Sequence, residues 1–306
     1  MANITKLGND PAAAAGGVMM VNTEWGAFDN AREVLPTTPF DSKVDRESIN
    51  PRFQAYEKFI SGMYLGEITR NMLLAFVDAA PKPILFNGKS TERLNKHYGL
   101  DTEMLSLVES AWRADAPREK GSDSEEDYAA LRDFSAPLVE GGIAPAMLHR
   151  LNRVREIVQE HLGFSPGEVS LRDAALVQWT AALVVRRAAR LSACGIAAVA
   201  LQMGYVTGLG KDARVAAPSA ERKPYSVGID GRWVLSLVLV VGHRLATLML
   251  HVCVVSHCVL DSLYQHYPGF EDRMREALRL LLGEEVEKLV LMGLAKDGSE
   301  VGGAHS

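Results

Sequence analysis

The sequence has little cysteine and no excess of positive charge, and each shortage excludes a class of protein. Its 306 residues include only 3 Cys, too few for a disulfide-stapled secreted domain. Lys and Arg total 33 against 38 Asp and Glu, without a basic run, so we expect no nucleic-acid partner. The opening MANITKLGND has no apolar core. The sequence therefore predicts no secretory signal and a cytoplasmic location.

Long apolar runs are also scarce, with one exception. The chain is 47% hydrophobic and 23% charged, as in ordinary globular proteins, and it is long enough for a large core. The exception is residues 232–261, RWVLSLVLVVGHRLATLMLHVCVVSHCVLD. A membrane helix needs about 20 consecutive apolar residues, and Arg244 interrupts this run at a high insertion cost. Cys253 and Cys258 lack zinc-site spacing, so we expect no protein-bound metal site in this stretch.

Apolar residues elsewhere recur at helical spacing. The pattern predicts one long helix from about Pro51 to about Val77, with proline at its start. It also predicts an amphipathic helix over 148–162 that ends at Gly163. Ser170 and Asp173 then form a capping-box pattern that opens a long, alanine-rich helix.

The remaining segments indicate strands, a further helix and loops. Residues 18–21 form a short apolar run typical of a buried strand. PGFEDRMREALRLLLG predicts a helix that ends at Gly283, and VEKLVLMGL predicts a strand. Residues 114–126 are highly charged and are interpreted as a solvated surface loop, with a regulatory segment as the alternative.

Two carboxylates stand near the ends of predicted elements. Glu24 follows the apolar run in VNTEWG, and Glu57 lies in the first turns of a predicted helix, with Gln54 one turn earlier on the same face. Paired carboxylate oxygens accept strong hydrogen bonds and suit vicinal sugar hydroxyls. From spacing alone, surface glutamates are the alternative interpretation.

The order of several motifs along the chain points to one protein family. VNTEWGAFDN, ESINPRFQAYEKFISGMYLGEITRNMLL, RRAARLSACGIAAV, VGIDG with SLYQHYPGFEDRMREAL, and LAKDGSEVGG follow one another along the chain. Together they resemble the hexokinases, most closely the glucokinase-type hexokinases of fungi. The resemblance covers nearly the whole chain except 232–261.

The resemblance implies an α/β, actin-like ATPase (ribonuclease H-like) fold, with residues 1–306 as the C-terminal, large domain without most of the small domain. It implies transfer of the terminal phosphoryl group of ATP, with Mg²⁺, to the 6-hydroxyl of glucose or a related hexose in glycolysis. By resemblance, the sugar ligands are Glu24, Gln54 and Glu57. The residues implied for the nucleotide are Gly62, Met63, Arg186, Arg190, Gly231, Ser262, Leu263 and His266.

The sequence also departs from the family. It has no DLGGTN-like phosphate loop, no TKGF-like sugar loop and no NDT-like segment carrying the family's catalytic Asp, the general base. We therefore expect no catalytic residue in this chain and no activity from the polypeptide as written. The alternatives are a non-catalytic, sugar-binding or regulatory hexokinase-like protein, or a membrane-associated protein anchored by residues 233–260.

The apolar stretch interrupts the family's DGS turn. Gly231 precedes it and Ser262 follows it; without residues 232–261 the flanks read VGIDGSLYQHYPGFEDR. We interpret the stretch as a translated intron. A genuine insertion that folds and a membrane segment are the alternatives.

Overall fold

The computed structural model describes residues 19–21, 25–114, 143–202, 204–216, 227–229, 237–239, 250–251 and 260–294. The chain divides into two compact units. Unit 1 comprises residues 1–25, 193–261 and 277–306, and unit 2 comprises residues 26–192 and 262–276. Most of the predicted site residues belong to unit 2.

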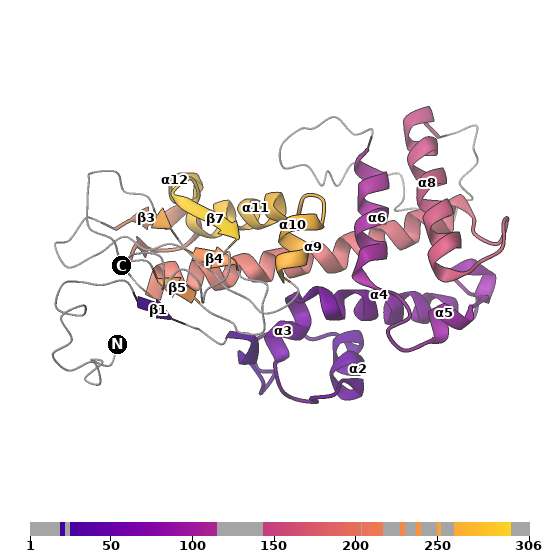
Figure 1. The fold of residues 1–306 in the computed structure, drawn as a ribbon, viewed down its shortest axis with the longest axis horizontal. Coiled ribbons are helices and arrows are strands. Elements are labelled where there is room, and N and C mark those ends of the chain that lie inside the picture. The colour runs from indigo at the N-terminus through magenta and orange to yellow at the C-terminus, as the bar shows by residue number, and fades with distance from the viewer. Residues whose placement is uncertain are drawn as a thin grey trace, which may run out of the picture. The chain divides into compact units, whose positions relative to one another are not determined.

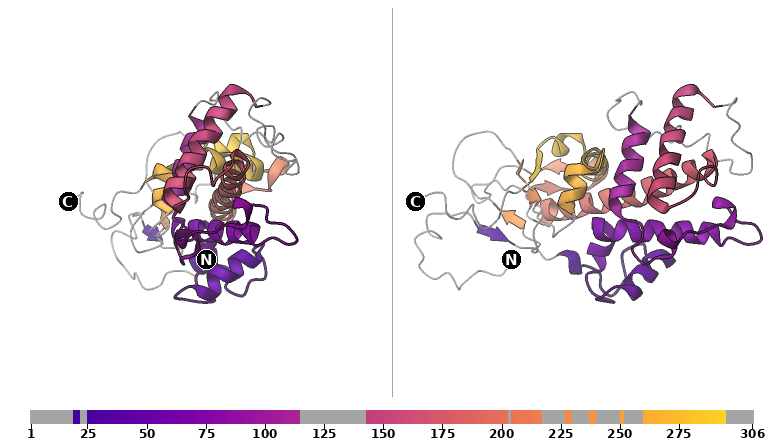
Figure 2. Two further views of the ribbon diagram at one scale, coloured as in Figure 1. Left: turned by 90° about the vertical axis from the view of Figure 1, so that its right-hand side faces the viewer. Right: turned by 45° about the vertical axis from the view of Figure 1, so that its right-hand side comes forward.

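Unit 2 is helical (Figure 1). Its helices are α2 (Pro39–Glu47), α3 (Ala55–Ile60), α4 (Gly62–Val77), α5 (Glu92–Asn95), α6 (Thr102–Arg113), α8 (Pro145–Leu162) and the part of α9 (Leu171–Gln202) up to Ser192. A 3-10 turn at Phe86–Gly88, most of α10 (Leu260–His266) and the start of α11 (Phe270–Leu282) complete it. Figure 2 shows the same elements from two further directions.

The core of unit 2 follows from amphipathic helices. Helices α6 and α8 pack side by side (Figures 1 and 2). Leu105 and Val108 on α6 and Leu151 and Val154 on α8 are buried. Burial of one such side chain contributes about 1.5–3 kcal/mol, so the apolar spacing read from the sequence stabilises this pair.

The single long helix predicted over Pro51–Val77 is wrong, because two helices occupy that range. Helix α3 begins only at Ala55, and Ser61 has extended backbone angles, φ −83° and ψ 133°, between α3 and α4. The apolar period passes through the break because the two helices follow each other directly and both bury apolar side chains. The predicted end at Val77 is confirmed.

Three predicted helix boundaries are confirmed, at Gly163, Ser170 and Gly283, whereas the helix predicted over 148–162 begins earlier, at Pro145. The Ser170 hydroxyl and the Asp173 backbone N–H form the capping box at the start of α9, and the Ser170 N–H donates in return to the Asp173 carboxylate. Gly163 ends α8 in the left-handed conformation, with φ 77°. Gly283 follows α11, with φ 80°. Capping depends on a few adjacent residues, which is why the sequence predicts it well.

Unit 1 contains the strands. Strand β1 (Met19–Val21) pairs antiparallel with β5 (Leu237–Leu239), and β2 (Val206–Thr207) pairs with β3 (Arg214–Val215). Strand β7 (Val290–Leu294) lies between β4 (Val227–Ile229) and β6 (Leu250–His251), parallel to both. The short helix α12 (Glu284–Glu287) and 3-10 turns at Trp25–Ala27 and Gly210–Asp212 complete the elements described. The predicted strands at 18–21 and in VEKLVLMGL are confirmed.

Two predicted segments lie largely outside the described residues. Of 232–261, the structure describes β5, β6 and the first residues of α10, and β5 and β6 pair with β1 and β7. Of 114–126, it describes only Ala114. Within the part of the chain that is described, no helix has the length and apolarity required to cross a bilayer.

Candidate functional site

The start of α3 presents the two predicted sugar ligands that the structure describes. Gln54 adopts the left-handed conformation, φ 53° and ψ 45°, directly before the helix. Its side-chain oxygen Oε1 is buried and has no hydrogen-bond partner among the described residues. Glu57 follows in the first turn and is half-buried. A buried oxygen without a donor favours a ligand hydroxyl at this position, because an unsatisfied polar group costs about 1–3 kcal/mol.

A buried lysine holds the loop before α3. Lys58 is 4% exposed, and its Nζ donates to Asp45 Oδ1 at 2.8 Å and to the carbonyls of Asn50 and Phe53 at 2.8 and 2.9 Å. Burial alone would raise the pKa of the Asp45 carboxyl. The hydrogen bond from Lys58, the Arg52 amide and the nearby positive charges outweigh this effect, so the pKa of Asp45 lies below its ordinary value.

A second tie joins the same helix to the segment after Trp25. Asn30 Oδ1 accepts a hydrogen bond from the Ala55 N–H at 3.0 Å, so it satisfies a donor at the start of α3. Asp29 organises that segment by accepting from the amides of Glu33, Val34 and Leu35. The pKa of Asp29 lies below its usual value, chiefly because its carboxylate accepts a hydrogen bond from the Leu35 N–H. Desolvation of the carboxylate acts in the opposite direction.

The break between α3 and α4 carries a further unpartnered group. Ser61 is 1% exposed, and its hydroxyl has no hydrogen-bond partner among the described residues. Gly62 and Met63 follow as the first residues of α4; Gly62 is buried and Met63 is 50% exposed. The free backbone N–H groups and partial positive charge of a helix start favour an anion, which suits the prediction of a nucleotide here.

Helix α6 connects Gly62 with His266. The Thr102 hydroxyl donates to the Gly62 carbonyl and accepts from the Gly66 N–H at 3.1 Å. One turn further along α6, the Ser106 hydroxyl donates to the His266 carbonyl at 3.2 Å. Residues four apart lie on one face of a helix, so the structure brings together two predicted nucleotide residues that lie far apart in the sequence.

The three arginines near the middle of α9 have different roles. Arg187 donates to both carboxylate oxygens of Asp41, at 2.8 and 2.7 Å, and its guanidinium lies 4.8 Å from the centre of the Phe59 ring. Arg186 and Arg190 lie one turn apart, half-buried and exposed respectively. Neither forms an ion pair with an acidic residue that the structure describes. These two can therefore serve an anionic ligand, whereas Arg187 is committed to the fold.

The remaining predicted site residues are either buried, exposed without a described role, or outside the described residues. Leu263 is 2% exposed and belongs to the core in this structure, whereas His266, on the same helix, is exposed. The backbone of Ser262 lies in α10, but its side chain is outside the description. Glu24 and Gly231 lie outside the described residues.

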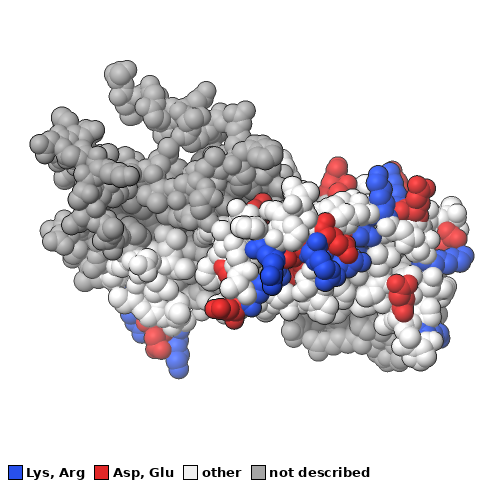
Figure 3. All heavy atoms as spheres, turned by 90° about the horizontal axis from the view of Figure 1, so that it is seen from below, with Lys and Arg blue, Asp and Glu red and all other residues white. Residues whose placement is uncertain are grey.

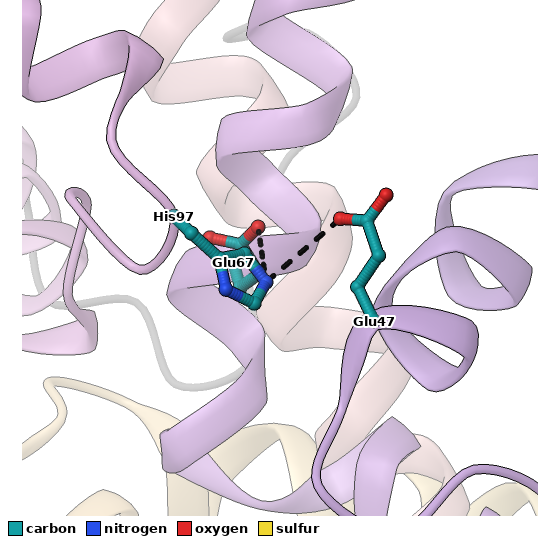
Figure 4. Close-up of side chains that lie close together, drawn as sticks. All are labelled: Glu47, Glu67 and His97. Atoms are coloured by element: carbon teal, nitrogen blue, oxygen red, sulfur yellow. Dashed lines mark ion pairs between the residues drawn. The ribbon is translucent and has the colours of Figure 1, made fainter.

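Among the described residues of unit 2, Glu47, Glu67 and His97 form a cluster of side chains of the types that bind metals (Figure 4). His97 Nε2 is 3.8 Å from Glu47 Oε2 and 3.6 Å from Glu67 Oε1. Arg70 already binds both oxygens of the fully buried Glu67. Because both oxygens of Glu67 already accept hydrogen bonds from Arg70, this carboxylate is a poor ligand for a divalent metal.

The sequence analysis missed several residues that shape the site: Asn30, Asp41, Asp45, Lys58 and Arg187. Lys58 directly follows Glu57, and a lysine is ordinarily expected to be exposed. Its partners lie 5 to 13 positions away, and those of Arg187 lie 146 positions away. A lysine between Tyr56 and Phe59, both apolar and buried, was the one available signal.

The charged side chains do not segregate on the face drawn in Figure 3. Lys and Arg are interleaved with Asp and Glu there, and neither sign forms a continuous patch over the described atoms. A mixed face of this kind is typical of an ordinary solvated surface.

Comparisons with known proteins identify the family. A sequence model of the hexokinases matches residues 1–134, 142–237 and 251–306. The glucokinase of Aspergillus niger is 31% identical over 297 residues, which cover 94% of this chain and 44% of that protein. Hexokinase-3 of rice (Oryza sativa subsp. japonica) is 32% identical over 288 residues, covering 94% and 43%. The chain belongs to the hexokinase family and spans less than half the length of these relatives.

The solved structures agree on the fold. The hexokinase of Schistosoma mansoni, solved in complex with glucose, superposes with a TM-score of 0.52 at 24% identity, covering 89% of this chain and 41% of that one. The fold is thus the actin-like ATPase fold in the form of a partial hexokinase domain. The family model leaves residues 135–141 and 238–250 unmatched, and the second gap falls inside the apolar stretch.

Proposed function

We propose that this chain forms part of the hexose and nucleotide sites of an ATP-dependent hexose 6-phosphotransferase that acts in the cytoplasm. The observation that carries the proposal is the buried Oε1 of Gln54, one turn before Glu57, which has no hydrogen-bond partner among the described residues. A sugar hydroxyl would donate to the amide oxygen, and the carboxylate would accept from a neighbouring hydroxyl. Glu24 is the third proposed sugar ligand. The preferred sugar is glucose or a related hexose.

ATP would be the second substrate. Gly62 and Met63 at the start of α4, Arg186 and Arg190 on α9, and His266 on α10 are proposed to bind it, together with Gly231 and Ser262; Leu263 is left out because its side chain is buried in the core. The Ser61 hydroxyl is buried and has no hydrogen-bond partner in the described part of the chain, so it would supply an additional donor. Mg²⁺ would enter with the nucleotide, since this ion is held largely by substrate phosphates and water.

The residues of this chain would position the sugar and bind the nucleotide, but they would not supply the catalytic base. Phosphoryl transfer depends on in-line placement of the two oxygens and on stabilising charge. Gln54 and Glu57 would orient the sugar, and Arg186 and Arg190 would offset phosphate charge. A general base for the 6-hydroxyl is not among the motifs of this sequence. We therefore propose that the 306-residue polypeptide binds hexose without phosphorylating it.

Calorimetry with glucose tests the proposal. The unmodified chain is expected to bind glucose weakly, and Glu57→Gln is expected to weaken binding about tenfold, the effect of losing one charged hydrogen bond. Glu103→Gln, which removes the same charge from an exposed position on α6, is the control and should bind like the parent. Absence of glucose binding by the parent chain would overturn the binding proposal. ATP-dependent formation of hexose 6-phosphate would overturn the proposed inactivity.

A further inference from the structure

The loop before α3 is held in an unfavourable backbone conformation. Arg52 and Gln54 both have left-handed backbone angles, with φ 68° and 53°. For a residue other than glycine, this conformation costs about 1–2 kcal/mol. Two such residues within three positions persist only if the surroundings over-determine them. The orientation of Gln54 therefore depends on whatever fixes the loop.

Lys58 supplies that restraint. Its ammonium has three protons, and all three are used: one for Asp45 Oδ1, one for the Asn50 carbonyl and one for the Phe53 carbonyl. The two carbonyls bracket Arg52 in the chain. The Asp45 carboxylate in turn accepts from the Arg52 N–H, with 3.1 Å to each oxygen. Lys58 and Asp45 thus hold the loop in place through hydrogen bonds to its backbone.

The geometry separates this role from ligand binding. Lys58 is 4% exposed, and its protons are all engaged, so it has no donor left for a sugar. Its neighbour Glu57 is half-buried and lies about 100° away around the helix. An arginine could not replace Lys58, because its planar fork cannot direct three donors from one nitrogen.

We propose that Lys58, acting with Asp45, is the positioning residue of the hexose site. It fixes the loop 50–54 so that Gln54 and Glu57 face one sugar in a single geometry. The inference rests on the proposed function, because it assigns Gln54 and Glu57 to the sugar. It adds a residue that contacts no ligand and that determines how selectively the site recognises hydroxyls.

The test compares Lys58→Met with Arg273→Met in the full 306-residue chain. Both substitutions remove a buried cation in unit 2, at 4% and 3% exposure, each paired with a carboxylate. Ligand-observed NMR titration would give the dissociation constants for glucose and for galactose, which differ in one hydroxyl orientation. A lower folded fraction weakens both constants equally, so their ratio reports only the geometry of the site.

We expect Lys58→Met to weaken glucose binding about tenfold and to move the galactose-to-glucose ratio of the dissociation constants towards one. Arg273→Met should leave that ratio unchanged. Lys58→Arg should resemble Lys58→Met. An unchanged ratio in Lys58→Met, or an equal change in Arg273→Met, would overturn the inference.

Backbone hydrogen exchange distinguishes this inference from the proposed function. If the parent chain binds no hexose, the proposed function fails, and exchange at the amides of residues 52–57 decides whether Lys58 fixes the loop. Faster exchange there in Lys58→Met but not in Arg273→Met supports the restraint. Equal exchange in the two variants overturns it.

Discussion

The indole ring of Trp25 packs directly against the backbone of Gly195 on α9. A Cβ built on Gly195 would lie 2.0 Å from Cζ3 of Trp25, closer than any real contact. The sequence analysis did not identify this partner, since an interior helical glycine indicates only that something approaches closely. Trp25 belongs to the VNTEWG motif, so this contact holds the residue next to Glu24 against α9.

Gly195→Ala is expected to lower the free energy of unfolding by about 1–3 kcal/mol, as overpacking does. Helix propensity alone predicts the opposite sign, because alanine is favoured over glycine by about 1 kcal/mol. Urea denaturation measures the difference. A variant more stable than the parent would show that the ring moves aside without cost.

Asp41→Asn should destabilise the protein by about 2–4 kcal/mol. It would leave the guanidinium of Arg187 without its carboxylate, and breaking a buried pair costs more than the pair contributes. The change would also weaken the capping box with Thr38 at the start of α2. Thermal unfolding is the measurement, with Glu284→Gln in the exposed pair with Lys288 as the control, expected to show no measurable change. Equal melting temperatures for Asp41→Asn and the parent would contradict the assignment.

The low pKa of Asp45 predicts a loss of stability in acid. Its pKa in the folded protein lies below the ordinary value of 3.8, so the ionised carboxylate stabilises the fold above that pH. The contribution disappears as pH falls through the folded pKa. We expect the free energy of unfolding of the parent to fall more steeply below about pH 4 than that of Asp45→Asn, which cannot titrate there. Parallel curves of unfolding free energy against pH would show that folding does not lower the pKa of Asp45.

Arg186→Ala and Arg190→Ala should each weaken ATP binding about three- to tenfold, because each removes a charge available to phosphate. Arg153→Ala, an exposed arginine on α8, is the control and should bind ATP like the parent. Arg187→Ala should reduce stability through the lost contact with Asp41. Equilibrium dialysis with labelled ATP measures the affinities. If the Arg153 and Arg190 variants behave alike, α9 does not contribute to a nucleotide site.

Deletion of residues 232–261 tests the proposed intron. If the stretch is foreign to the fold, its removal rejoins the DGS motif and should raise both soluble yield and melting temperature, since it removes a long apolar segment from the chain. Loss of the pairing of β5 with β1 and of β6 with β7 would instead lower stability. Sequencing of the native transcript provides the independent check, with the codons for 232–261 expected to be absent. A transcript that retains them, with a less stable deletion variant, would identify a genuine insertion.

The family and most helix ends could be read from the order of residues alone. The motifs around Gln54 and Glu57 indicated a sugar kinase, and the caps at Gly163, Ser170 and Gly283 fixed boundaries. Caps and periodicity act within a few residues, so they can be read directly from the order of residues.

Three features became visible in the folded protein alone: the break at Ser61, the burial of Lys58, and the different surroundings of Arg186 and Arg187. Each depends on a partner brought close by packing, as Asp41 is to Arg187 across 146 positions. Neighbouring residues of one type look equivalent in a sequence. In the fold, the helix rotates each by about 100° relative to the next, so Arg187 meets the buried carboxylate of Asp41 and Arg186 does not.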